Sequence, residues 1–187
     1  MEFLAIPFII YFNAFLTGVI TKCADLVNDD GLKASKVVNI LLGMLWGILA
    51  SLVVLGNADI AAFYLGILLS WIFRYKLDNY AHGIGGSILL VAIFFVYPIS
   101  SIQLLIAGVT FVLFTFFGLL TRHQIISKNI FVDYNVYSFI FLVGLSIFYS
   151  NIWIVALASL ANVVGYHGVK QGWKRFIKIS ASRRIEV

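Results

Sequence analysis

The sequence predicts an all-α integral membrane protein, a polytopic bundle of about seven transmembrane helices with its amino terminus outside and its carboxyl terminus in the cytoplasm. Of the 187 residues, 62% are hydrophobic and 11% are charged, and the mean hydropathy is +1.03. A soluble fold cannot bury that much apolar surface. Apolar stretches long enough to cross roughly 30 Å of hydrocarbon as α-helices alternate with polar connections that hold all 13 Lys and Arg residues.

The first half of the chain contains four of the predicted helices. The first ends where Thr21 and Lys22 begin a long polar stretch, and the break Gly56-Asn57 separates the second from the third. The third ends before Arg74, and the fourth follows a polar loop that runs to His82. These segments cover residues 3–20, 37–55, 58–73 and 83–96, and the fourth is short enough to be half-buried or to thin the bilayer locally.

The second half contains the other three predicted helices. Tyr97-Pro98 precedes the fifth, a polar stretch from Thr121 follows it, and Ser150-Asn151 separates the sixth from the seventh. These segments cover residues 102–120, 136–149 and 152–166, and the sixth is again short. The predicted domains are a transmembrane bundle over 1–168 and a basic cytoplasmic juxtamembrane tail over 169–187.

The orientation follows from the connections, which alternate between short uncharged turns and long polar loops. If all seven segments cross, every Lys and Arg lies on one side of the membrane, opposite the amino terminus. Positive charges mark cytoplasmic loops, so we expect this side to face the cytoplasm. The expected location is a prokaryotic cell membrane, which the chain crosses several times. The same role accounts for the positive net charge of +5, so no nucleic-acid partner is expected.

A polar track descends the first helix toward the cytoplasmic side. Residues four apart share one face of a helix, and two carboxylates at that spacing can hold a divalent cation. The alternative is a solvated acidic loop whose charges are offset by lysines. The track consists of Asn13, Thr17, Thr21, Asp25 and Asp29, and the predicted Mg²⁺ ligands are Asp25, Asp29 and Asp30.

The second polar loop combines fixed positive charge with an acid/base pair. Arg74 and Lys76 suit a phosphate group, as does Lys33 from the first loop. Asp78 and His82 are four residues apart and are the predicted catalytic acid/base residues. The alternative is an ordinary cytoplasmic loop with one carboxylate paired to a base.

Two short motifs are similar to those of known membrane enzymes. The pair Asp25-xxx-Asp29 resembles the aspartate-rich magnesium and diphosphate site of the UbiA-type prenyltransferases, although Thr21 stands where their Asn would be. The stretch from Asp30 to Ser35 resembles the opening of the CDP-alcohol phosphotransferase signature, with Ser35 in place of its Arg. Each likeness is confined to one loop, so neither assigns a family.

The sequence therefore favours a magnesium-dependent membrane enzyme, a lipid-phosphate transferase or hydrolase of lipid metabolism. Its substrate would be an isoprenoid or phospholipid phosphate or diphosphate at the cytoplasmic face. The alternatives are a small cation- or proton-coupled transporter or channel and a noncatalytic subunit. Expected partners are membrane lipid and a divalent cation, and the small-xxx-small spacing of Gly43 and Gly47 also allows a homo-oligomer.

Overall fold

The computed structural model describes residues 2–28, 32, 34–77, 79–96, 100–123, 125, 132 and 135–185, and the side chains of these except 28 and 178–185. The fold is all-helical, with 87% helix and no strand in the part described. Among the described residues, a short 3₁₀ helix, η1 (Glu2–Ala5), precedes seven α-helices. They are α1 (Pro7–Asn28), α2 (Lys36–Gly56), α3 (Ala58–Phe73), α4 (Tyr80–Phe94), α5 (Ser101–Arg122), α7 (Val136–Ser146) and α8 (Ile152–Ile185). The all-helical character of the predicted fold class is confirmed.

Polar side chains fix where four of these helices begin. Ser35 accepts a hydrogen bond from the Val38 amide at the start of α2, and Asn57 and Asn79 cap α3 and α4 in the same way. Ser100 and Gln103 form a reciprocal capping box at the start of α5. Each cap satisfies backbone N–H groups that the first helical turn leaves without partners.

Four of the helices that the structure describes are long and apolar enough to cross a membrane: α1, α2, α5 and α8. Only 22–33% of the residues in each apolar span are buried inside the bundle, so most of them are at least partly exposed. An apolar exterior of this extent needs lipid rather than water around it. By length and composition, these four helices support the expectation of an integral membrane protein.

The helix bounds differ from the sequence prediction at four places. α1 covers Pro7–Asn28 where 3–20 was expected. α4 begins three residues earlier, at Tyr80, because Asn79 caps it. α7 has 11 residues where 136–149 was expected. α8 continues through the basic tail as one helix of 34 residues, so the tail is an extension of the last helix.

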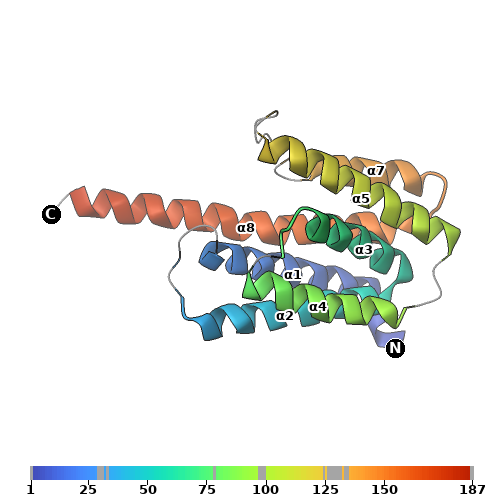
Figure 1. The fold of residues 1–187 in the computed structure, drawn as a ribbon, viewed down its shortest axis with the longest axis horizontal. Coiled ribbons are helices and arrows are strands. Elements are labelled where there is room, and N and C mark those ends of the chain that lie inside the picture. Colours follow the sequence, from blue (N-terminus) through green and yellow to red (C-terminus); the bar gives the residue numbers. More distant parts are fainter. Residues whose placement is uncertain are drawn as a thin grey trace.

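The helices lie along a common long axis and alternate in direction (Figure 1). The carboxyl ends of α1, α3, α5 and α8 lie at the same end as the amino ends of α2, α4 and α7. We call this the cationic end, because it carries Lys22, Lys36, Arg74, Lys76, Arg122 and Lys170. The amino terminus lies at the opposite end (Figure 1).

Close helix contacts depend on small residues. α1 packs against α8 and α2, α2 against α4, and α3 against α5. A Cβ at Gly43 would lie 2.7 Å from Ala81 Cα, and one at Gly47 would lie 2.8 Å from Gly85 Cα. The Gly43/Gly47 face is thus covered by α4 of the same chain, and a second copy would have to use another surface.

Candidate functional site

A cavity of about 790 Å³ opens among the helices toward the cationic end. All seven α-helices contribute residues to its wall, together with the segments that join α3 to α4 and α5 to α7. At about 1.5 Å per residue, the eight residues from Asp25 back to Thr17 on α1 span about 12 Å. Both residues line the cavity, so it extends well into the apolar part of the bundle.

The wall of the cavity changes in character along its depth. Near the cationic end it carries five basic side chains and a single carboxylate, Asp25, among the described lining residues. Deeper in the bundle it is largely aromatic and aliphatic, with a few hydroxyl and amide groups on α1, α3 and α8. The basic residues are Lys22, Arg74, Lys76, Arg122 and Lys170, and the deeper apolar ones include Trp46, Phe63, Leu68, Leu89, Phe114 and Phe117.

Asp25 is held by hydrogen bonds from two other helices. Its Oδ1 lies 3.0 Å from His82 Nε2 on α4, and its Oδ2 accepts a 2.5 Å hydrogen bond from the Tyr166 hydroxyl on α8. The side chains of Asp25 and His82 are only 14% and 13% exposed. The three side chains form a partly buried, hydrogen-bonded group on the cavity wall, which we call the Asp25 cluster.

The hydrogen bonds of Asn79 assign the tautomer of His82. Asn79 Oδ1 accepts the His82 backbone N–H at 2.9 Å, so the amide NH₂ is the group that faces His82 Nδ1, at 2.7 Å. An NH₂ group can only donate, so Nδ1 is the acceptor and the imidazole hydrogen is on Nε2. His82 therefore donates to Asp25 through Nε2.

Lys22 lies beside the Asp25 cluster, and only 5% of its surface is exposed. Its Nζ is 5.3 Å from the centre of the Tyr166 ring, within the range of a cation–π interaction. The hydroxyl of the same ring donates to Asp25. Tyr166 thus contacts both a cation and a carboxylate on α1.

Arg74 ends α3 and is held at the cavity wall by its own helix. Its Nε donates to the Ser70 carbonyl at 3.3 Å and to Ser70 Oγ at 3.2 Å. Tyr75 follows with φ 54°, a left-handed conformation that ends the helix. A Cβ at Gly118 on α5 would overlap the Arg74 guanidinium, so the glycine provides the space that the guanidinium occupies.

Burial lowers the pKa of Arg74 from its ordinary value, and the field of Tyr137 acts in the opposite direction. A guanidinium stays protonated in proteins in spite of such a shift. Arg74 is therefore a partly desolvated, fixed cation in the cavity wall. Such a cation gains from an anionic ligand that replaces its lost water.

Four of the predicted site residues lie on the wall of this one cavity: Asp25, Arg74, Lys76 and His82. Asp25 and His82, 57 positions apart in the chain, are in direct contact. The remaining four, Asp29, Asp30, Lys33 and Asp78, lie outside the described residues. The roles assigned to all eight stay predictions.

A metal site is not assembled by the described residues alone. They contain no group of three or more His, Cys, Asp or Glu that could hold an ion. Both oxygens of Asp25 already accept hydrogen bonds, from His82 and Tyr166. The described part of the cavity is thus better suited to an anion than to Mg²⁺, whose other predicted ligands are Asp29 and Asp30.

Four residues of the site were not predicted from the sequence: Tyr166, Asn79, Arg122 and Lys170. Tyr166 is 141 positions from Asp25 in the chain, so no local pattern connects the two residues. The role of Asn79 could have been predicted in part, because Asn is a typical N-cap residue and Asn79 directly precedes α4. A capping side chain bonds to the backbone three residues later, which here is His82.

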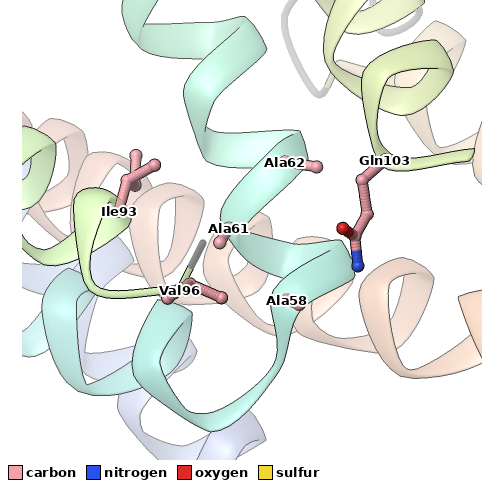
Figure 2. A pocket seen from close by; sticks show the side chains of 6 residues that line it. All are labelled: Ala58, Ala61, Ala62, Ile93, Val96 and Gln103. Atoms are coloured by element: carbon pink, nitrogen blue, oxygen red, sulfur yellow. The ribbon is translucent and has the colours of Figure 1, made fainter. Parts of the chain in front are cut away.

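A second, much smaller pocket of about 10 Å³ lies at the opposite end, between α3, α5 and the end of α4. Figure 2 shows the Gln103 side chain at its edge, among small side chains of α3. Gln103 Nε2 donates to Asp59 Oδ1 at 3.0 Å. The space holds about one water molecule, so it offers no room for a substrate.

Comparison with known proteins gives no relative from which a function could be inferred: no family model, no curated protein and no solved structure matches this chain.

Proposed function

We propose that the chain is a membrane enzyme that acts on a lipid carrying a phosphate or diphosphate at the cytoplasmic face. In this proposal all seven α-helices cross the membrane, with the amino terminus outside and the carboxyl terminus in the cytoplasm. The alternating helix directions support seven crossings (Figure 1). The basic residues gathered at one end support its cytoplasmic location.

The observation that carries the proposal is the amphipathic cavity. Five basic side chains surround its polar part, where Asp25 is the only carboxylate among the described lining residues. That excess of positive charge suits the oxygens of a phosphate or diphosphate. The aromatic and aliphatic wall deeper in the bundle suits the hydrocarbon chain of the same molecule. A soluble phosphate compound would make no use of the apolar half.

The Asp25 cluster lies on the wall of the cavity, and in this proposal it supplies an acid/base pair. Asp25 is the acceptor in both of its hydrogen bonds, and His82 holds a transferable hydrogen on Nε2. Arg74 and Lys76 would hold the phosphate, while the cluster takes a proton from an attacking hydroxyl or gives one to the leaving oxygen. Positioned proton transfer of this kind contributes about 10²–10⁴-fold to a rate.

A magnesium site in this proposal needs Asp29 and Asp30, because the described residues alone do not form one. If a divalent cation binds, these residues would hold it together with Asp25, and it would neutralise phosphate charge. The basic residues of the cavity already provide part of that neutralisation. Turnover with and without Mg²⁺ therefore tests the metal separately from the lipid site.

The test is turnover by the full-length protein reconstituted in liposomes. Polyprenyl phosphate, polyprenyl diphosphate and phosphatidic acid are supplied in turn, and mass spectrometry follows loss of the lipid and release of phosphate. We expect Asp25→Asn to lower turnover at least about 100-fold because it removes the proton acceptor. The matched control is Asp59→Asn, a carboxylate that is also hydrogen-bonded but lies at the opposite end. Equal activity in both variants would overturn the assignment of Asp25.

A transporter is the second candidate, since a cavity open at one end also suits alternating access. The lining favours the enzyme, because Asp59 and Gln103, the polar pair of the opposite end, are not among the described residues of the cavity wall. Ion or proton flux into liposomes that depends on Asp25, with no lipid turned over, would favour the transporter instead.

A further inference from the structure

The arrangement around His82 leads to an inference that rests on the proposed function and assigns roles within its site. We infer that Asn79 is a positioning residue, which holds His82 in the Nε2–H tautomer so that Asp25, and not the imidazole, is the proton acceptor of the site. Asp78 and His82 are the acid/base residues predicted from the sequence, and this inference changes the role of His82 to that of a hydrogen-bond donor.

The first step concerns the orientation of the Asn79 amide. Its Oδ1 accepts the His82 backbone N–H at 2.9 Å and so caps α4. Rotating the amide by a half-turn would point its NH₂ group at a backbone N–H, placing two donors face to face. The cap therefore fixes the NH₂ group toward His82 Nδ1, 2.7 Å away.

The second step concerns the imidazole. Because Nδ1 receives a hydrogen bond from Asn79, it holds no hydrogen, and the ring hydrogen of the neutral side chain is on Nε2. Nε2 lies 3.0 Å from Asp25 Oδ1. The other tautomer would place a lone pair of Nε2 against the carboxylate and lose both hydrogen bonds.

The third step concerns the neighbours of the ring. The Trp71 ring lies with its centre 6.2 Å from that of His82. Between α2 and α4, Trp46 Nε1 donates to the carbonyl of Ala81, the residue before His82. These contacts restrain the start of α4, so the direction of the Nε2–H bond is set by the fold before any ligand enters.

The substrate-independent test is nuclear magnetic resonance of the full chain with ¹⁵N-labelled histidine, at alkaline pH where a free imidazole is neutral. The signal of His82 is assigned by its loss in His82→Gln. We expect a protonated Nε2 and an unprotonated Nδ1 in the wild type. In Asn79→Asp, whose carboxylate keeps the cap but can only accept, we expect the hydrogen to move to Nδ1.

The matched control is Asn57→Asp, the same change at the asparagine that caps α3 at the opposite end. It should leave the His82 signals and the turnover unchanged. Asn79→Asp should lower kcat about 10- to 100-fold, as loss of a residue that orients a functional side chain does, with little change in KM. Asn79→Gln, which restores an amide on a longer side chain, should recover part of the tautomer signal and of kcat together.

The outcomes separate this inference from the proposed function. A hydrogen on Nδ1 in the wild type, or an unchanged tautomer in Asn79→Asp, would overturn the role of Asn79 whether or not lipid is turned over. If the expected tautomers are observed but no lipid phosphate is turned over, the role of Asn79 is supported and the proposed enzymatic function is overturned. A tautomer that shifts while kcat stays constant would show that Asp25 does not need the His82 hydrogen, and would overturn the inference as well.

Discussion

Gly118 is the residue whose side-chain volume most directly tests the phosphate role of Arg74. A methyl group at position 118 would overlap the Arg74 guanidinium, which is the mobile end of a long side chain. Gly118→Ala should therefore displace Arg74 without unfolding α5. A hydrogen bond to a charged group contributes about 1.5–3 kcal/mol, so we expect KM for the lipid phosphate to rise about 10- to 100-fold.

The control for Gly118→Ala is Gly108→Ala on the same helix. A Cβ at Gly108 meets nothing within 4 Å, so this variant changes helix propensity alone. It should have the KM of the wild type. If the two variants show the same KM, Arg74 does not bind the phosphate.

Tyr166 allows the hydrogen bond to Asp25 to be removed by itself. Tyr166→Phe deletes the hydroxyl that donates to Asp25 Oδ2 but keeps the ring beside Lys22. We expect a loss of about 1.5–3 kcal/mol in unfolding free energy, because the acceptor is a carboxylate, together with lower turnover. Unfolding is followed by tryptophan fluorescence during denaturation in detergent.

Tyr149→Phe is the comparison for that measurement, since Tyr149 is 49% exposed and lies at the opposite end of the bundle. Its unfolding free energy should stay within about 0.5 kcal/mol of the wild type, as is usual for an exposed substitution. A Tyr166→Phe protein as stable and as active as Tyr149→Phe would mean that the hydroxyl does not hold Asp25.

At the scale of the helices, the seam between α2 and α4 determines where His82 lies. Gly47 and Gly85 bring the two backbones together, and the Trp46 indole packs over Gly85. In Gly47→Ala the new Cβ would lie 2.8 Å from Gly85 Cα and 2.9 Å from its carbonyl oxygen. Backbone atoms cannot move aside as a side chain can, so we expect a destabilisation of about 1–3 kcal/mol.

The unfolding free energy in detergent measures this effect, with Gly144→Ala as the control. Gly144 is exposed on α7, and a Cβ there meets nothing within 4 Å. Turnover should also fall in Gly47→Ala, because a shifted α4 carries His82 away from Asp25. A Gly47→Ala protein as stable as Gly144→Ala would show that the seam tolerates a wider spacing.

The sequence predicted most of the helices because hydropathy and polar breaks mark them directly. It could not predict which surface Gly43 and Gly47 would face, since close helix packing looks the same in sequence whether the partner is α4 or another chain. It also placed the end of the last helix too early. Hydropathy falls after Tyr166, but residues such as Lys170 and Lys174 are good helix formers, and α8 continues through them.

At the scale of the whole molecule, the distribution of charged residues among the polar loops predicted that four site residues would lie close together. These are Asp25, Arg74, Lys76 and His82. Alternating helix directions bring every second connection to the same end of a bundle, so polar residues of separate loops meet there. The exact pairing was not predictable. The contact between Asp25 and His82 depends on how α1, α4 and α8 are arranged around the cavity, and the hydropathy pattern holds no information on that arrangement.

The proposed topology depends most on α7. Its 11 residues span about 16 Å, roughly half of the hydrocarbon core, so flanking residues or local thinning of the bilayer must complete the crossing. If α7 did not cross, Asn151 would stay on the same side of the membrane as Ala34. Both positions are exposed, which makes them suitable for labelling.

We therefore predict opposite accessibility for single cysteines at these two positions, each introduced after replacing Cys23 with Ser. In intact cells a membrane-impermeant maleimide should label Asn151→Cys, and it should label Ala34→Cys only after detergent is added. Protection of both would place Asn151 in the cytoplasm and remove α7 from the crossing helices. Labelling of Ala34→Cys alone would reverse the orientation and place the cationic end outside, where the positive-inside rule does not put basic residues.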